Sequence, residues 1–531
     1  MLRNIHDALT KLDQCMNQSG DVSAITFHRG VEREALRVSR TDGKISQTAH
    51  PNALGSALTH PSITTDYSEA LMEFITGVHD SVEGVIDELN DIHLYTNRVL
   101  DSMDECLWPG SMPCALSSNE EVPIAYFGES NSGKLKRIYR EGLSNRYGRI
   151  MQCIAGMHYN FSFSDEFWAF LADLRGVNID TPDALQAFKS QQYFALIRNF
   201  RRKSWMLSLL FGASPAIDAS FLEQKPSKLA QLDERTWGGQ SATSLRMSDI
   251  GYQNKAQDGL FVCYNEVDTY INTIKGALRT PYPAYEQIGV KVDGDYKQLS
   301  HNILQIENEY YSDIRPKRVT QSGEHPSAAL QKRGVEYIEV RIMDLDPTSP
   351  IGMQPETLYF LDTFLMCCML HGDTPLDADE CQQLRKTQQE IATHGRELDS
   401  HFDFGFGPVA LRDKASELLA HMQEIAQFLT ERTGNQAYVE SLAIQQNKLT
   451  HLETLPSAHI LQLCEQFGSY QAAMLSIGKA QQAAWLGQSM SPELEQKFKQ
   501  WAQESITQQA NIEASDDVDF DTFLKHYMQP Q

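Results

Sequence analysis

Hydrophobic and polar residues alternate in three stretches of the chain, and this alternation predicts β-strands at residues 31–39, 156–164 and 335–344. The segment Arg40-Thr-Asp-Gly43 joins the first stretch to the run KISQT at 44–48, and Asp-Gly between two such runs is typical of a β-hairpin. Because a hairpin joins antiparallel strands, the pattern favours an antiparallel sheet over a doubly wound parallel one.

Apolar residues recur at helical spacing in other parts of the chain. They predict an amphipathic helix at residues 1–14 and further helices at 81–103 and 190–211, the last ending at a Gly-Ala-Ser-Pro turn. Beyond about residue 375 the chain is rich in Gln, Glu, Ala and Leu with helical spacing. We therefore predict an α+β fold, with a catalytic α+β core over residues 1–375 and a mostly helical C-terminal region, residues 376–531, packed on it.

Composition and charge narrow the classes of partner. The 531 residues carry 46 Lys and Arg against 70 Asp and Glu, a formal net charge of −24. Phosphate backbones and anionic lipids would repel such a chain, so we expect no nucleic-acid and no membrane partner.

Nine cysteines without a CxxC pair suit a reducing cytoplasm, and the adjacent Cys367 and Cys368 lie in an apolar run typical of a buried helix. The N-terminus lacks the apolar core of a secretory signal, and no apolar run is long enough to span a membrane. We expect a soluble cytoplasmic protein.

The polar faces of the predicted strands carry the candidate chemistry. Residues two apart in a strand share a face, so Glu32 pairs with Glu34, and Glu339 with Arg341, while His158 lies on the polar face of the strand at 156–164. If these strands are neighbours, they form a floor of carboxylates with a histidine and an arginine. Carboxylates together with substrate phosphates bind Mg²⁺, and an arginine can offset the charge of a transferred phosphoryl group. The alternative is that these are the solvated faces of an amphipathic sheet.

Two segments allow more than one interpretation. In TTDYSEALMEFITG (64–77), Asp66 and Glu69 have capping-box spacing, and Glu73 lies either on the following helix or at the start of a strand. In GESNSGKL (128–135), the glycines and the lysine have P-loop spacing, and the strand-like run VPIAYF precedes them. A P-loop, however, needs Ser or Thr where this chain has Leu135, so we do not expect a phosphate-binding loop there.

Blocks distributed along residues 29–341 resemble one known family. They are RGVEREALRV, HPNALGSALTHPSITTDYSEALMEFIT, IYREGLSNRYG, GMHYNFS, LFGASPA, ATSLRMSDIGYQNK, IRPKR and GVEYIEVR. In this order they closely resemble the proteobacterial type of glutamate–cysteine ligase, whereas the segment DERTWGGQS (233–241) departs from the family pattern. The resemblance implies a mainly antiparallel sheet funnel similar to glutamine synthetase, surrounded by helices. It also implies ATP-dependent ligation of the L-glutamate γ-carboxylate to the L-cysteine amine, the first step of glutathione biosynthesis.

The same resemblance assigns roles to individual residues. The positions expected to bind Mg²⁺, or Mn²⁺ in its place, are Glu32, Glu34, Asp66, Glu73, His158 and Glu339. The expected catalytic residues are Arg341, Glu339 and Arg140, and those expected to contact ATP, a co-substrate, are Arg341 and Arg246. The amino-acid substrates are expected to contact Tyr67, Tyr139, Arg140, Leu143, Gln152, Arg246, Tyr252 and Tyr311. SNSGKLK is expected to be a loop beside the site, and the protein a monomer.

Two alternatives to this function stay open. A related carboxylate–amine ligase would keep the phosphate chemistry and accept a different amine. A non-catalytic metal- or nucleotide-binding regulator would keep the fold without needing the whole acidic set, and the presence of all six expected metal positions weighs against it.

Overall fold

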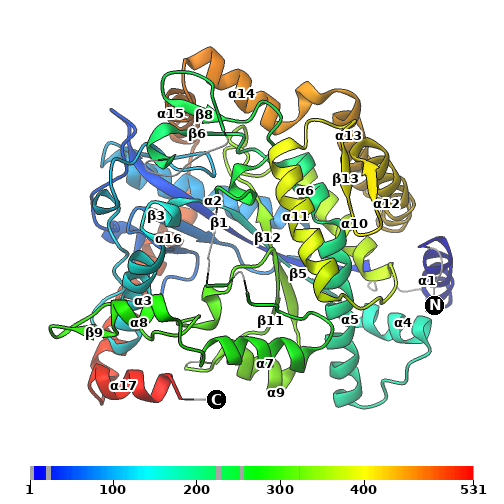
Figure 1. Ribbon diagram of the computed structural model, residues 1–531, viewed down its shortest axis with the longest axis horizontal. Coiled ribbons are helices and arrows are strands. Elements are labelled where there is room, and N and C mark those ends of the chain that lie inside the picture. Colours follow the sequence, from blue (N-terminus) through cyan, green and yellow to red (C-terminus); the bar gives the residue numbers. More distant parts are fainter. Residues whose placement is uncertain are drawn as a thin grey trace.

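An antiparallel sheet of seven strands runs through the centre of the computed structural model (Figure 1), which describes residues 5–19, 25–222, 229–251, 256–257, 259–321 and 323–529. The strand order is β11-β12-β5-β1-β3-β2, with β4 paired to the far end of β1. The bounds are β1 Phe27–Ser39, β2 Ile63–Thr65, β3 Leu71–Ile75, β4 Glu105–Leu107, β5 Met157–Phe163, β11 Ile314–Lys317 and β12 Tyr337–Met343. The three predicted strands and their antiparallel pairing are confirmed.

The register of the sheet decides which polar residues meet. Strand β1 pairs with β5 on one side and β3 on the other, so Glu32 lies opposite His158 and Glu34 lies opposite Glu73. Strand β12 pairs with β5 on its other side. The polar faces of β1, β3, β5 and β12 therefore form one continuous surface.

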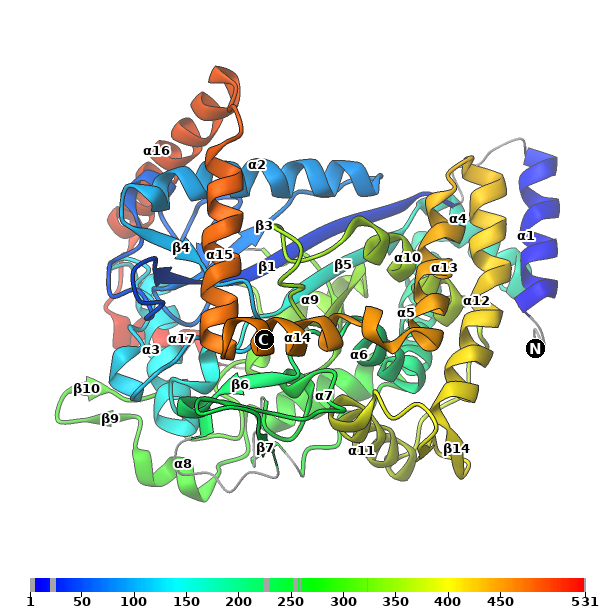
Figure 2. The same cartoon turned by 90° about the horizontal axis from the view of Figure 1, so that it is seen from above.

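Helices cover the apolar face of the same sheet. The predicted helix at 81–103 is α2 (Val82–Asp101), which lies along β1 and β3 in Figure 2 and packs His93 against Phe74 of β3. On the same face, Tyr159 of β5 donates a hydrogen bond of 2.6 Å to Asp362 of α10 (Pro355–Leu370). Helix α10 also buries Cys367 and Cys368 completely, as their apolar run predicts.

Two sequence predictions need correction in detail. The helix predicted at 190–211 is two helices, α5 (Pro182–Lys203) and α6 (Trp205–Phe211), because the chain tightens at Ser204, whose carbonyl accepts from Leu207 three residues on. The Asp-Gly turn closes as predicted, with Gly43 at φ +70°. The runs 44–48 and 122–127, however, make only isolated bridges and no strand.

The remaining elements surround this two-layer core. The predicted N-terminal helix is α1 (Ile5–Ser19), which packs on α4 (Asp165–Arg175) and α12 (Leu411–Thr433). The other helices before residue 375 are α3 Asn131–Tyr147, α7 Val267–Ala277, α8 Pro283–Ile288 and α9 Pro326–Arg333. Three small sheets comprise β6 Ala216–Asp218, β7 Ala230–Gln231 and β8 Thr236–Gly238; β9 Lys291–Val292 and β10 Asp295–Tyr296; and β13 His401–Asp403 and β14 Pro408–Ala410.

The C-terminal region is helical, as its composition predicts. Its helices are α11 Ala378–His394, α12 Leu411–Thr433, α13 Ala437–Thr450, α14 Pro456–Phe467, α15 Tyr470–Leu486, α16 Pro492–Ser515 and α17 Phe520–Tyr527. Helix α15 crosses α2 and β4, and α17 contacts α3, so late segments lie beside early ones (Figures 1 and 2). The division into two parts at residue 375 stays a prediction. No helix within the described ranges has the length and apolarity needed to cross a membrane.

Candidate active site

Four strands bring an acidic cluster together on the polar face of the sheet. We use this name for Glu32 and Glu34 of β1, Glu73 of β3, His158 of β5 and Glu339 of β12. His158 lies at its centre: its Nδ1 is 3.1 Å from Glu32 Oε2 and 3.8 Å from Glu339 Oε1, and its Nε2 is 3.7 Å from Glu34 Oε1. The strands that carry Glu32, His158 and Glu339 are therefore neighbours, which is the condition that the sequence left open. The alternative of a solvated face is wrong for Glu339, which is only 1% exposed.

Hydrogen bonds and ion pairs from neighbouring residues orient the carboxylates. Asn160 Nδ2 donates to Glu32 Oε1 at 2.9 Å, and the Gly156 amide donates to Glu34 Oε2 at 2.6 Å. Glu339 Oε1 lies 3.2 Å from Lys317 Nζ and 3.3 Å from Arg341 Nη1. Sequence reasoning did not select Asn160 or Lys317. The alternation in β5 already placed Asn160 on the polar face, but nothing local identified Lys317, which comes from the edge strand β11.

The charges in the cluster are unevenly compensated. Burial and the neighbouring Glu32, Asp66 and Glu34 raise the pKa of Glu73 well above its ordinary range. Burial acts in the same direction on Glu339, but Lys317, Arg341 and His158 outweigh it and hold the pKa of Glu339 well below that range. Around Glu73 the neighbouring carboxylates and burial thus outweigh the positive charge of Lys136.

The cluster fits a hard divalent cation. One ligand atom each from Glu32, Glu73 and His158 lie within 4.8 Å of one another, which is a span that one ion can bridge. Glu339 Oε2 is buried and has no hydrogen-bond partner within the described parts of the chain, although a buried carboxylate oxygen normally has one. Carboxylate oxygens are the ligands that Mg²⁺ prefers, whereas His158 is an unusual ligand for it.

Asp66 and Glu69 do not form a capping box. They lie in the turn between β2 and β3, so Glu73 is on a strand and the helical alternative is wrong. Glu69 accepts hydrogen bonds from the backbone amides of His50 at 2.9 Å and Tyr126 at 2.8 Å, and so ties two loops together. The spacing of Asp66 and Glu69 does not distinguish the two structures, because acidic residues three apart occur both at helix starts and in turns of this kind. Asp66 is half-buried beside the cluster, where its charge acts on the pKa of Glu73 and Glu34.

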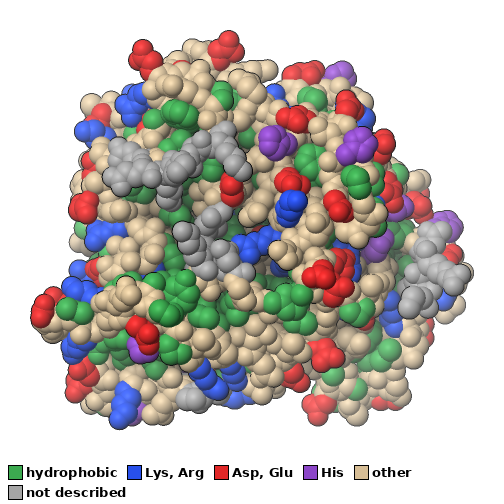
Figure 3. All heavy atoms as spheres, in the orientation of Figure 1, with side chains coloured by type: hydrophobic (Ala, Val, Ile, Leu, Met, Phe, Trp, Pro, Cys, Tyr) green, Lys and Arg blue, Asp and Glu red, His purple; other side chains and the backbone are tan. Residues whose placement is uncertain are grey.

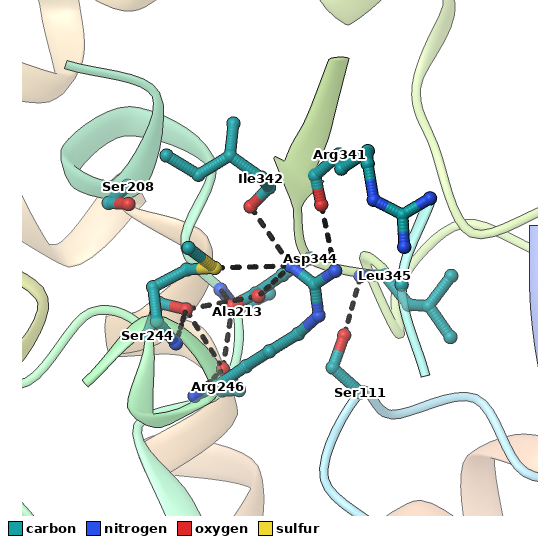
Figure 4. A network of polar contacts seen from close by, with 12 residues as sticks. Ser111, Ser208, Ala213, Ser244, Arg246, Arg341, Ile342, Asp344 and Leu345 are labelled. Atoms are coloured by element: carbon teal, nitrogen blue, oxygen red, sulfur yellow. Dashed lines mark hydrogen bonds and ion pairs between the residues drawn. The ribbon is translucent and has the colours of Figure 1, made fainter. Parts of the chain in front are cut away.

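The two predicted phosphate-binding arginines lie at the end of β12 and differ in their contacts. The pKa of Arg341 is raised, because Glu339, Glu34 and Glu32 outweigh the opposing effect of burial. Arg246 is 6% exposed and donates to the backbone carbonyls of Ile342 at 3.1 Å and Arg341 at 2.8 Å. Figure 4 shows its guanidinium held against the strand, while the Arg341 side chain points away from it. The structure thus shows Arg246 bracing β12, and its role toward ATP stays a prediction.

Helix α3 lies beside the acidic cluster and carries three of the predicted substrate contacts. Arg140 Nε donates to the Asp66 carbonyl at 2.5 Å, and its guanidinium lies 4.4 Å from the centre of the Phe127 ring. Tyr139 is half-buried and Leu143 buried on the same helix. Tyr67 and Gln152, predicted in the same group, are buried in the segments that follow β2 and precede β5.

Tyr311 and Arg246 line a cavity of about 710 Å³ bounded on its other side by α11. Arg201 and Arg385 also line it, and the face in Figure 3 is hollowed near its centre with basic side chains in that area. Tyr252, the last predicted substrate contact, lies outside the described residues. The roles of all these residues toward amino acids stay predictions.

The segment GESNSGKL is not a P-loop, and it is not a loop throughout. Residues from Asn131 onward form the first turn of α3, capped by Ser130, whose hydroxyl accepts from the Gly133 amide at 3.1 Å. Gly133 and Lys134, expected in a loop, are therefore helical. A Cβ on Gly133 would lie 2.4 Å from the Phe127 carbonyl oxygen, so close backbone approach explains this glycine.

Comparison with known proteins gives the class of protein that this fold and site belong to. A family model described as glutamate-cysteine ligase matches residues 12–391 of the chain. Glutamate–cysteine ligases of Pseudomonas paraeruginosa and Alcanivorax borkumensis are 46% and 44% identical to it, over 94% and 97% of this chain and 93% and 98% of theirs. The chain belongs to the glutamate–cysteine ligase family.

Solved structures agree with this result. The glutamate–cysteine ligase of Francisella tularensis, determined in complex with AMP, superposes with a TM-score of 0.88 at 35% identity and covers 95% of this chain and 97% of its own. A bifunctional glutathione synthetase from Pasteurella multocida has a TM-score of 0.69 at 22% identity, covering 89% of this chain and 54% of its own, and indicates a shared fold alone.

Proposed function

We propose that this protein joins the γ-carboxylate of L-glutamate to the amine of L-cysteine with ATP, giving γ-glutamylcysteine, ADP and phosphate, the first step of glutathione biosynthesis. Beyond membership of the family, one structural observation supports the proposal most strongly. The sheet register places four glutamates and His158 on one face, with Arg341 at its edge. Such a face can bind divalent cations through its carboxylates and a nucleoside triphosphate through those cations and Arg341.

The reaction needs two steps, because a free carboxylate is a poor acyl donor. A γ-carboxylate oxygen of glutamate attacks the γ-phosphorus of ATP, the bond to the bridging oxygen breaks, and ADP leaves. The cysteine amine then attacks the carbonyl carbon of γ-glutamyl phosphate, loses a proton, and phosphate departs. Catalysis of phosphoryl transfer is mostly positioning and charge compensation.

The acidic cluster and Asp66 would hold Mg²⁺, or Mn²⁺ in its place. The carboxylates crowded around Glu73 and the unpartnered Glu339 oxygen support this assignment. A bound divalent cation offsets the negative charge of the ATP phosphates. The cluster would then form the floor of a funnel like that of glutamine synthetase, with helices around it.

Two arginines compensate substrate charge in this proposal. Arg341, on the same face as Glu339, contacts the γ-phosphate, and its raised pKa keeps it cationic. Arg140 contacts the amino-acid side of the reaction from α3, together with Tyr139, Leu143 and Tyr67. Arg246 acts from behind β12 by fixing the strand that carries Arg341 and Glu339. The nine cysteines are all free thiols, which supports a cytoplasmic enzyme, and we propose a monomer.

The test is ADP release by the purified protein with Mg-ATP and L-glutamate, with and without L-cysteine. We expect cysteine to stimulate release and mass spectrometry to find one γ-glutamylcysteine per ADP. Turnover with another amine but not with cysteine would reassign the protein as a related ligase. No turnover with any amine would favour a binding protein that does not catalyse the reaction.

A further inference from the structure

The segment at residues 509–527, which we call the C-terminal segment, hydrogen-bonds to the start of helix α3. Asp516 Oδ2 accepts from the Asn131 amide at 2.6 Å, and the Val518 carbonyl accepts from Asn131 Nδ2 at 2.9 Å. Glu513 Oε1 accepts from the Glu129 amide at 2.9 Å. Three hydrogen bonds from the C-terminal segment thus hold Glu129 and Asn131, and α3 begins at Asn131.

These contacts supply what the first turn of a helix lacks. The first amides of a helix have no partner within it, and the positive end of the helix dipole favours an anion there. Ser130, the residue just before α3, caps one of these amides. The Asp516 carboxylate accepts from a second of these amides, that of Asn131. Asn131 itself is only 4% exposed.

The C-terminal segment is itself fixed at its far end. Asp521 of α17 accepts from Lys291 Nζ at 2.8 Å and from Tyr296 Oη at 2.6 Å, both on the β9–β10 hairpin. Tyr527 packs against the His325 ring at 4.7 Å, and its carbonyl lies 2.9 Å from His325 Nε2. The segment therefore spans from α16 across the start of α3 to the N-terminus of α9 (Figure 1).

Helix α3 is held at its other end by a separate ion pair. Arg146 is buried and pairs with Glu309 at 2.9 Å, and it also donates to Gln298 Oε1 at 3.0 Å. Tyr139 and Arg140 lie between these two anchors. Since helices rise about 1.5 Å per residue, Arg140 lies roughly 13 Å from Asn131, and a shift at the start of α3 reaches it through a rigid element.

We propose that the C-terminal segment positions α3, so that Asp516 and Asn131 are positioning residues for the amino-acid site through Arg140. The inference rests on the proposed function, in which α3 contacts an amino-acid substrate and not ATP. It predicts that loosening this anchor weakens amino-acid binding selectively, because the groups predicted to bind ATP are on β12 or hydrogen-bonded to it.

The test uses full-length variants and measures the Michaelis constants of L-glutamate, L-cysteine and ATP separately. We expect Asp516→Ala to raise the KM of an amino-acid substrate about fivefold, since small displacements of positioning groups have large kinetic effects, with the KM of ATP unchanged. Asp516→Asn, which can still accept from the Asn131 amide, should restore most of the loss. Asp517→Ala is the matched control, because Asp517 is an exposed neighbour.

Two further variants separate positioning from general stability. Asn131→Ala removes the donor to Val518 from the other side and should reproduce the selective change in KM. In an Arg140→Lys background, Asp516→Ala should add little, because residues that act through one group are not additive. A uniform change in all three Michaelis constants, or a lower Tm without any change in KM, would overturn the inference. A parent enzyme that makes no γ-glutamylcysteine would instead refute the proposed function.

Discussion

The acidic cluster and helix α3 lie side by side, but different kinds of interaction position them. The cluster is fixed by the hydrogen-bond register of adjacent strands, so each carboxylate has its place once β1, β3, β5 and β12 pair. Helix α3 is fixed at its start by residues from the end of the chain. The comparison teaches that a regular strand register can place a set of charged side chains on one face, whereas the adjacent helix, with its predicted substrate contacts, depends on individual hydrogen bonds from another segment.

The largest expected effect comes from removing a carboxylate of the cluster. We expect Glu339→Ala to lower kcat about a thousandfold, because a metal ion stabilises transition-state charge by several kcal/mol. The fold should persist, since the partners Lys317 and Arg341 are 27% and 19% exposed and can be solvated. Steady-state kinetics with Mg-ATP and a thermal melt check both points.

The matched control for this substitution is Glu336→Ala on the same segment. Glu336 is 45% exposed and pairs with Arg318 at the surface, so its loss should leave kcat within about twofold, as exposed ion pairs contribute little. If Glu339→Ala kept more than a tenth of the parent activity, the metal-site assignment would be wrong.

Much of the cluster could be predicted from sequence because strand periodicity is a local property. Alternation assigned Glu32, Glu34 and Glu339 to polar faces, and the structure joined those faces. Glu73 could not be assigned in the same way, because β3 is five residues long and follows a turn whose acidic spacing resembles a helix cap. The contacts of α3 were beyond local reasoning altogether. No periodicity links Asn131 to Asp516, and the resemblance predicts a loop for SNSGKLK, where the structure has the start of a helix.

A smaller effect should appear in the pH dependence of stability without metal. The raised pKa of Glu73 means that the folded protein holds this proton after the unfolded chain has released it. Metal-free protein should therefore lose stability as pH rises above the ordinary glutamate range, until Glu73 ionises in the folded state. Glu73→Gln should reduce this loss, as measured by Tm against pH in chelator.

Magnesium should have the opposite effect to chelator on the comparison between the parent protein and Glu73→Gln. A cation favours the charged carboxylate, so added Mg²⁺ should raise the Tm of the parent protein more than that of Glu73→Gln. Identical pH profiles in chelator, together with an identical response to Mg²⁺, would contradict both the charge crowding at Glu73 and its place in a metal site.

The smallest expected effect tests the α3 side of the comparison through Gly128, which has φ +83°. A Cβ there would lie 2.2 Å from Gln509 Nε2 and 2.3 Å from Glu513 Oε1. Both atoms are the ends of flexible side chains that can move, but moving Glu513 breaks its bond to the Glu129 amide. We expect Gly128→Ala to destabilise the fold by about 2 kcal/mol, from backbone strain and displaced contacts, and to raise an amino-acid KM.

Gly176 provides the control that separates strain from contact. It has φ +67° at the end of α4, and a Cβ there meets nothing within 4 Å, so Gly176→Ala carries backbone strain alone, about 1 kcal/mol. Thermal melts of the two variants should therefore differ modestly, whereas only Gly128→Ala should change an amino-acid KM. Since both glycines lie outside the sheet, equal kinetics in the two variants would mean that the start of α3 does not influence the site. A selective change at Gly128 would instead link Gln509 and Glu513 to substrate binding through the start of α3.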